Sequence, residues 1–156
     1  MNFLTALESS GFAEWVRSSF TGYPIMIACH AVGMAIMVGL SVALNLRVLG
    51  WFPEIPYQAL HRFLGIAWLG FGINFLSGSG LFVTQATVYV TDITFLLKMA
   101  FVVAGMITVA VLQTSVKRHA ASWSAALPPP GVRVVAVVSI FCWVMATITG
   151  RLIAYL

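Results

Sequence analysis

The stretch from Thr21 to Gly50 constrains the fold more than any other part of the chain. It carries no Asp, Glu, Lys or Arg between Ser18 and Leu46. A helix of about 20 apolar residues is long enough to cross the hydrocarbon core of a bilayer, so this stretch predicts a transmembrane helix. One polar ring, His30, lies inside it. An ionisable side chain within a span is costly and rare, which makes His30 the first candidate for a functional residue.

The composition agrees with a membrane protein. Of the 156 residues, 61% are hydrophobic and 8% are charged, whereas soluble domains average about 25% charged residues. The formal net charge is +4. In a chain this apolar, an excess of Lys and Arg indicates which loops face the cytoplasm rather than a nucleic-acid partner. We therefore expect the lipid bilayer as a partner and no nucleic acid.

Four apolar stretches are long enough to cross a bilayer. They are residues 22–48, 62–83, 93–117 and 132–156. Residues 1–20 carry apolar side chains at helical spacing, which predicts one short amphipathic helix in the membrane interface. Thr21 is a candidate N-cap of the first span. We therefore predict an all-α, single-domain integral membrane protein, a four-helix bundle with an N-terminal interfacial helix.

Basic residues are distributed unequally between the two ends of this bundle. The loops that join the first to the second span and the third to the fourth share one side. Their basic residues are Arg47, Arg62, Lys117, Arg118 and Arg133. The opposite side holds only Arg17 and Arg151. The positive-inside rule therefore places both loops in the cytoplasm and both termini in the periplasm, in a bacterial inner membrane.

Some residues in the spans predict how the helices pack. Small residues recur every four positions along the first span, at Ala31, Ala35, Gly39 and Ala43. Such a row lets another helix approach closely in lipid, so we expect it to pack inside the bundle. Asn74 and Gln113 are polar groups within the spans. We expect both to hydrogen-bond across helices.

Three separate stretches place ionisable side chains at one depth. His30 lies six residues after Pro24, near the outer end of the first span. Lys98 lies six residues after Asp92, and Arg151 lies five residues before the end of the chain. At about 1.5 Å of helical rise per residue, each lies roughly 8 to 9 Å below the outer surface. The sequence therefore predicts that an imidazole, an ammonium and a guanidinium share one layer.

A layer with two cations and no acid is predicted to bind something anionic, because buried cations without a counter-charge are unfavourable. A b-type haem meets this requirement, since its iron takes a neutral nitrogen of His30 while its propionates pair with Lys98 or Arg151. Gly33, about one turn after His30, is predicted to leave room for the flat macrocycle. Alternatively, both cations snorkel to the surface and His30 hydrogen-bonds to a neighbouring helix.

Two further ligand sets are open. His61 and His119 lie near the cytoplasmic ends of the second and third spans, as candidate ligands of a second haem iron or as side chains solvated at the interface. Met26, His30 and Met34 fall on one stripe of the first span, and thioether and imidazole ligands suit copper(I). The methionines are alternatively core packing, or one of them, such as Met34, is a sixth haem ligand.

A resemblance to known proteins rests on a series of short motifs. They are Tyr23-Pro24, His30 with Gly33, Leu46-Arg47 with Leu49-Gly50, Ser77-Gly78 with Leu81-Phe82, Phe95 with Lys98, and Gly150-Arg151 with Ile153-Ala154. In this order they resemble a family of small, uncharacterised bacterial four-span membrane proteins, over nearly the whole chain. More distantly, the first-span histidine and the third-span lysine resemble the CopD copper-resistance family and the HemJ-type protoporphyrinogen oxidases.

The HemJ-type resemblance implies a role for two residues. In that family a first-span histidine and a third-span lysine are tied to haem binding, and here they correspond to His30 and Lys98. The acidic motif of its fourth span is not found here, where the chain has Gly150-Arg151. The resemblance therefore implies haem binding without implying the oxidase activity, and the copper family implies only the fold.

Together these observations predict a membrane haem b protein that transfers single electrons. Without an aqueous domain of its own, it is expected to work as a homo-oligomer or as a subunit of a larger membrane redox complex, with a quinone as a candidate partner. A copper-handling membrane protein and a structural accessory subunit without a cofactor are the alternatives.

Overall fold

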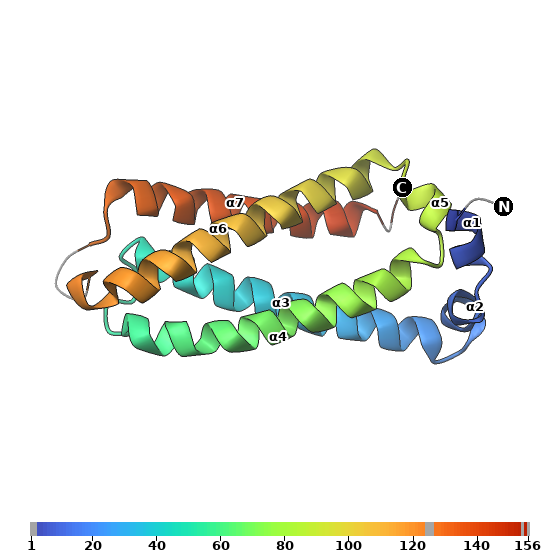
Figure 1. The fold of residues 1–156 in the computed structure, drawn as a ribbon, viewed down its shortest axis with the longest axis horizontal. Helices are drawn as coiled ribbons and strands as arrows, with labels where there is room; N and C mark the ends of the chain where they lie inside the picture. Colours follow the sequence, from blue (N-terminus) through green and yellow to red (C-terminus); the bar gives the residue numbers. More distant parts are fainter. Residues whose placement is uncertain (1–2, 124–126, 154, 156) are drawn as a thin grey trace.

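Four long helices make up most of the chain in the computed structural model, which describes residues 3–123, 127–153 and 155, without the side chains of residues 61 and 120. These four are α3 (Gly22–Val48), α4 (Tyr57–Phe82), α6 (Ile93–Trp123) and α7 (Pro130–Leu152). Each contains a stretch that is long and apolar enough to cross a membrane. They lie side by side in alternating directions (Figure 1). The chain is therefore an all-α, multi-pass membrane bundle, as predicted.

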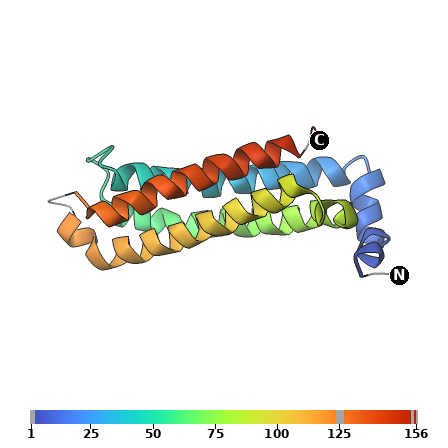
Figure 2. The same cartoon turned by 90° about the horizontal axis from the view of Figure 1, so that it is seen from above.

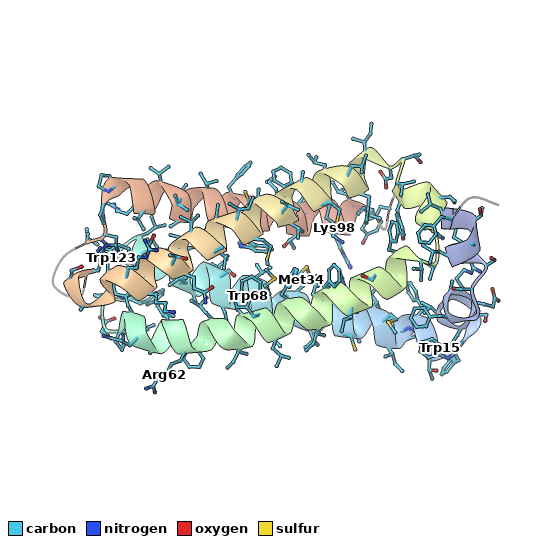
Figure 3. All side chains as sticks on the ribbon, viewed as in Figure 1. Trp15, Met34, Arg62, Trp68, Lys98 and Trp123 are labelled. Carbon is cyan, nitrogen blue, oxygen red and sulfur yellow. The ribbon has the colours of Figure 1, made fainter. Side chains whose placement is uncertain are left out.

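Two helices extend beyond the predicted spans. Helix α4 begins at Tyr57 instead of residue 62, because Pro56 in extended backbone occupies its N-cap position. Arg62 falls inside this longer helix and points away from the bundle (Figure 3). Helix α6 continues past Lys117 to Trp123. The charges that limited the predicted spans therefore lie on exposed helix faces and do not end the helices.

The predicted amphipathic helix over residues 1–20 is two helices, α1 (Phe3–Glu8) and α2 (Gly11–Ser18). The break falls at a pair of serines. Ser10 is the N-cap of α2, and its Oγ accepts a hydrogen bond from the Ala13 backbone N–H at 3.2 Å. A serine favours a helix start over a helix interior, which explains why one helix ends here and another begins. Both helices lie at the end of the bundle that holds the chain termini (Figure 2).

The predicted N-cap position of the first span is confirmed, but its side chain does not make the capping bond. Thr21 occupies the N-cap position of α3 but its side chain makes no capping hydrogen bond. The hydroxyl of Ser19 instead accepts hydrogen bonds from the backbone N–H groups of Thr21 and Gly22, each at 3.2 Å. Ser19 therefore satisfies donors that a helix start leaves unpaired.

The N-terminal segment, residues 3–18, is tied to the connection between α4 and α6. This connection contains a short helix, α5 (Ala86–Tyr89). The Glu8 carboxylate accepts hydrogen bonds from the backbone N–H and the hydroxyl of Thr87, at 2.8 and 2.7 Å. The guanidinium of Arg17 donates to the Thr84 carbonyl at 3.0 Å. The segment is thereby fixed across the end of the bundle.

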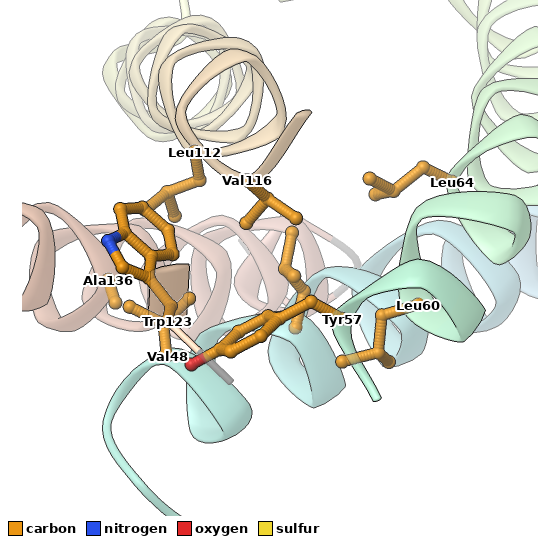
Figure 4. Close-up of a cluster of buried hydrophobic side chains, with 9 residues drawn as sticks. Val48, Tyr57, Leu60, Leu64, Leu112, Val116, Trp123 and Ala136 are labelled. Carbon is orange, nitrogen blue, oxygen red and sulfur yellow. The ribbon is translucent and has the colours of Figure 1, made fainter. Parts of the chain in front are cut away.

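The bundle is solidly packed at the end that holds the α3–α4 loop. A cluster of buried apolar side chains joins all four long helices there (Figure 4). It consists of Leu44, Val48, Tyr57, Leu60, Leu64, Leu112, Val116, Trp123 and Ala136. Among the described side chains of α6, buried residues are found only from Gly105 onward. The half of the bundle nearer the termini is therefore less completely filled.

Arg47, one of the predicted loop cations, is buried at this packed end. Its guanidinium donates to the carbonyls of Ile55 and Pro53, at 2.7 and 3.2 Å. It also lies 4.3 Å from the centroid of the Tyr57 ring, within the range of a cation–π contact. Arg47 therefore fixes the α3–α4 loop in addition to adding positive charge to that side.

Helices α3 and α4 approach each other closely at two glycines, Gly33 and Gly70. A Cβ atom on Gly33 would lie 2.7 Å from the Gly70 carbonyl oxygen and 2.6 Å from the Asn74 backbone nitrogen, so the backbones of the two helices are in contact. The predicted packing row is on another face, because all four of its residues are exposed: Ala31, Ala35, Gly39 and Ala43. The expectation that this row packs inside the bundle is therefore wrong for this chain.

Candidate functional site

A cavity lies between the α3–α4 pair and the α6–α7 pair, in the half of the bundle nearer the termini. Its volume is about 340 Å³, within the roughly 300 to 1,000 Å³ typical of ligand sites. All four long helices contribute to its lining, which includes His30, Met34, Gly78, Phe82, Lys98 and Arg151. The incomplete packing of this half therefore leaves space for a small molecule.

Four residues singled out in the sequence meet in this cavity. His30 and Met34 reach it from α3, Lys98 from α6 and Arg151 from α7. Figure 3 shows the Lys98 side chain extending from α6 into the bundle, above Met34. The prediction that the imidazole and the two cations converge is confirmed by this shared lining. That they hold a cofactor stays a prediction.

The imidazole of His30 is oriented by α4. Its Nδ1 lies 3.0 Å from the Asn74 carbonyl oxygen. A carbonyl can only accept, so Nδ1 carries the proton and Nε2 keeps its lone pair. Nε2 has no hydrogen-bond partner among the described residues. A histidine that binds a metal commonly donates its other N–H to a backbone carbonyl in this way.

Asn74 also holds the backbone of His30. Its side-chain Nδ2 donates to the His30 carbonyl at 2.8 Å, which confirms the predicted interhelical role of Asn74. Gln113 accepts from Trp68 Nε1 at 3.2 Å, as predicted, between α6 and α4. The alternative in which His30 hydrogen-bonds to a neighbouring helix is thus realised. It occupies only Nδ1 and leaves the other nitrogen available.

Two glycines that the sequence reasoning did not assign to the site make room for its side chains. A Cβ on Gly78 would lie 2.9 Å from Cε1 of His30, so the ring rests against a bare backbone. A Cβ on Gly150 would lie 3.3 Å from Cε and 3.6 Å from Nζ of Lys98, which places the ammonium beside α7. Both glycines belong to the short motifs on which the family resemblance rests. Those motifs were the only feature of the sequence that pointed to a role for them at the site.

The two cations have no acidic partner among the described residues. The one ion pair found there joins Arg17 to Glu14, outside the cavity. Asp92, the acid nearest to the predicted layer, accepts a hydrogen bond from the Thr94 backbone N–H at 2.7 Å at the start of α6. Arg151 is exposed, whereas Lys98 is half-buried. Because an unpaired cation away from water is unfavourable, Lys98 makes the cavity suited to an anionic ligand.

Three aromatic rings form the wall of the cavity between α4 and α6. Phe82, Tyr89 and Phe95 lie with ring centroids 5.2 to 6.2 Å apart and are nearly parallel. Burial raises the pKa of Tyr89 above its usual value, with Tyr23 and Asp92 adding to the effect. Tyr89 was not among the site residues predicted from the sequence. In the sequence, the indication of this wall was that the aromatic residues lie in and on either side of the short connection between α4 and α6.

The prediction for Gly33 is wrong. Its missing side chain leaves space for the α4 backbone, as described above, and not for a macrocycle in the cavity.

Only part of the predicted methionine stripe lines the cavity. Sδ of Met26 lies against Gly80, 3.0 Å from the position of an added Cβ. Of the predicted copper ligands, His30 and Met34 line the cavity and Met26 is not among its lining residues. That this set binds copper stays a prediction.

The second histidine pair is placed only in part. His119 is exposed on α6, where its Nδ1 lies 3.2 Å from the Ser115 carbonyl oxygen and its ring stacks on Trp123 with centroids 5.6 Å apart. The side chain of His61 lies outside the described residues. Within the described part of the chain, no group of three or more His, Cys, Asp or Glu side chains is arranged to hold a metal ion.

The cavity thus combines one imidazole nitrogen that is free to bind a metal, two cations and a wall of aromatic rings. These groups are of the kinds that could hold the iron, the carboxylates and the flat apolar body of a haem. Comparisons with protein-family models, with curated proteins and with solved structures found no match for this chain.

Proposed function

We propose that this chain is a membrane protein that binds a b-type haem in the cavity and takes part in one-electron transfer. The proposal rests on one observation above all. His30 lines the cavity together with Lys98 and Arg151, its Nε2 has no hydrogen-bond partner among the described residues, and no acid is among the lining residues. When bound, the haem would supply an iron centre that accepts and returns single electrons.

Each group of the cavity has a separate part in holding the haem. His30 would hold the haem iron through Nε2, and its Nδ1–H bond to the Asn74 carbonyl would make that nitrogen a better ligand. Lys98 and Arg151 would neutralise the propionates through charge-assisted hydrogen bonds. Phe82 and Phe95 provide an apolar surface along one side. Met34 is the candidate sixth ligand, since it shares the cavity with His30.

The setting is a bacterial inner membrane with both termini in the periplasm. This orientation follows from the basic residues at the α3–α4 and α6–α7 ends, and it places the cavity in the periplasmic half. The described chain consists of the bundle and the short helices at its end. We therefore propose that it exchanges electrons as a homo-oligomer or as a subunit of a larger redox complex, with a membrane quinone as a candidate donor.

The absorption spectrum of the purified protein, oxidised and reduced, tests the proposal. We expect a Soret band and reduced-state bands of b-type haem in the parent, and their loss in His30→Ala. His119→Ala is the matched control, because that histidine is exposed and lies outside the cavity. Circular dichroism and gel filtration establish that both variants are folded.

Three outcomes would contradict the proposal. A full haem band in folded His30→Ala would remove the ligand assignment. A parent without haem that contains bound copper by metal analysis would favour copper handling through His30 and Met34. A parent with neither would favour a structural subunit, in which His30→Ala leaves the assembly of its complex intact.

A further inference from the structure

We infer that the cavity opens sideways into the bilayer between α3 and α7, so that its ligand is a membrane-dissolved amphiphile with an anionic end. This inference depends on the proposed function for the identity of the amphiphile, a haem. The position of the opening does not depend on the identity of the ligand. It follows from which sides of the cavity are closed and which side is not.

Two sides of the cavity are closed by side chains. The nearly parallel rings of Phe82, Tyr89 and Phe95 cover the side between α4 and α6. At the inner end, Met37 and Trp143 belong to a buried cluster with Val109. These side chains obstruct the α4–α6 side and the inner end of the cavity.

The N-terminal segment covers the end that faces the aqueous phase. Thr84 lines the cavity and also accepts the hydrogen bond from Arg17. Thr87, in the same connection, is held by the Glu8 carboxylate. Helices α1, α2 and α5 gather at this end of the bundle (Figures 1 and 2). A water-soluble ligand would have to displace these contacts to enter.

The remaining side carries the exposed lining residues. On α3 the side chains of Tyr23 and Ile27 are 51% and 43% exposed, and Ala31 is exposed as well. On α7 the exposed lining residues are Thr147 and Arg151. By contrast, every lining residue of α4, α5 and α6 is buried or half-buried. The opening therefore lies between α3 and α7.

The surroundings of this opening are apolar. Val32 on α3 is 55% exposed, and Val144 and Ile148 on α7 are also exposed. On membrane-spanning helices such side chains contact lipid, so the opening lies at the depth of the hydrocarbon. The ligand consequently reaches the site from the bilayer.

The charges define the chemical class of this ligand. Arg151 is exposed near the end of α7, where a long cationic side chain reaches the headgroup layer. Lys98 is half-buried and lies against Gly150 on the cavity side of the same helix. An amphiphile that enters with its flat apolar body between the helices can keep an acidic group on these two cations throughout. A neutral lipid would leave both unpaired.

Spin-label accessibility in liposomes tests the opening without any ligand. Cys29 is exposed and Cys142 is buried, so single labels are introduced in a Cys29→Ser background. The test positions are Ala31→Cys and Thr147→Cys. Val144→Cys is the lipid-facing control and Glu54→Cys, in the α3–α4 loop, is the aqueous control. Collision rates are measured with oxygen, which dissolves in lipid, and with a water-soluble nickel chelate.

We expect labels at Ala31 and Thr147 to match the label at Val144, with frequent oxygen collisions and few nickel collisions. Frequent nickel collisions at either position, as at Glu54, would show that the cavity opens to water and would overturn the inference. Rare collisions with both reagents would show that another protein, such as a second copy, covers this side, and would overturn it as well.

The ligand route is tested by haem uptake from vesicles that hold hemin in their bilayer. Ala31→Trp places a large side chain in the opening, and Val32→Trp is the matched control on the adjacent lipid-facing position. We expect Ala31→Trp to slow the rise of the Soret band by about tenfold or more, within the one to three decades over which association rates vary among variants of one site. Equal rates in the two variants would contradict the route. A parent that takes up no haem would remove the proposed function, while the spin labels would still decide the opening.

Discussion

His30 and Asn74 exchange two hydrogen bonds across the α3–α4 interface. His30 Nδ1 donates to the Asn74 carbonyl at 3.0 Å, and Asn74 Nδ2 donates to the His30 carbonyl at 2.8 Å. The direction of the imidazole is therefore set by the contact between two helices. Because Gly33 permits that contact, a change in helix packing should appear as a change at the site.

We first predict that Asn74→Ala affects both stability and haem binding. The variant loses its side-chain bond to the His30 carbonyl, and such bonds in membranes contribute about 0.6 kcal/mol on average and at most about 1.7. Loss of this bond loosens the α3–α4 contact that orients the His30 imidazole. The haem bands should therefore also broaden or shift. Gln113→Ala is the control, since it removes the bond to Trp68. Unfolding in detergent and absorption spectra should show a loss of stability in both variants and a spectral change in Asn74→Ala alone. Identical spectra in the two variants would contradict the link between this contact and the site.

The second prediction compares two glycines on α3. Gly33→Ala inserts a methyl group where the α4 backbone lies 2.6 to 2.7 Å away, so the helices must separate. We expect a loss of about 1 to 3 kcal/mol in the free energy of unfolding. Gly39→Ala meets nothing within 4 Å, and it should gain up to about 1 kcal/mol from helix propensity. Equal effects, measured by unfolding in one detergent, would mean that the close approach at Gly33 is not important for stability.

The third prediction concerns the cations of the cavity. Lys98→Met and Arg151→Met each remove a charged partner of an anionic ligand while keeping an unbranched side chain. A hydrogen bond to a charged group contributes about 1.5 to 3 kcal/mol, which corresponds to roughly 10- to 150-fold weaker binding. Haem titration measures the change. Lys117→Met, an exposed residue near the other end of α6, should bind haem as the parent does. Unchanged affinity in both cavity variants would show that these cations do not hold the propionates.

The fourth prediction is a pH dependence at the N-terminal segment. Hydrogen bonds from Thr87, first from its backbone N–H, hold the pKa of the Glu8 carboxyl below its usual value of 4.5. A lowered pKa in the folded state stabilises the contact above the unfolded-state pKa, and this stabilisation is lost as the pH falls through the folded-state value. A spin label at Ala6→Cys in the Cys29→Ser background should therefore become more mobile below about pH 4.5.

Two variants serve as controls for this pH dependence. Glu8→Gln should make the label mobile already at neutral pH and remove the transition, because its amide cannot carry the charge that Thr87 stabilises. Glu14→Gln removes a carboxyl that pairs with Arg17, and it should keep the transition. A transition that persists in Glu8→Gln would assign it to another group.

The depth of residues along the helices could be predicted from the sequence, whereas their direction could not. Helical rise is nearly constant, so His30, Lys98 and Arg151 could be placed in one layer by counting residues. The face that each helix turns to its neighbours is found from a contrast between polar and apolar sides, and a membrane span is apolar all round. For this reason Gly33 was assigned to the cavity when it lies against α4, and Ala35 was assigned to the bundle interior when it is exposed.

The structure at the aqueous end could be predicted least. A helix of four residues such as α5 is too short to produce a periodic pattern, and the contact between Glu8 and Thr87 joins residues that are far apart in the chain. The break at Ser10 was present in the sequence as a capping residue. We predicted one helix because the helical spacing of apolar residues over residues 1–20 continues on both sides of Ser10.

The two halves of the bundle have different roles. The packed half stabilises the fold, and the less filled half contains the cavity. The cluster around Leu112 and Val116 joins all four long helices far from the cavity, so it can keep the bundle assembled whether or not a ligand is present. The spacing between the α3–α4 pair and the α6–α7 pair can then adjust to the thickness of a guest molecule, while the Gly33 contact keeps α3 and α4 together. Substitutions that reshape the pocket should accordingly be tolerated by the fold, which makes this small bundle a suitable scaffold for binding other planar molecules within a membrane.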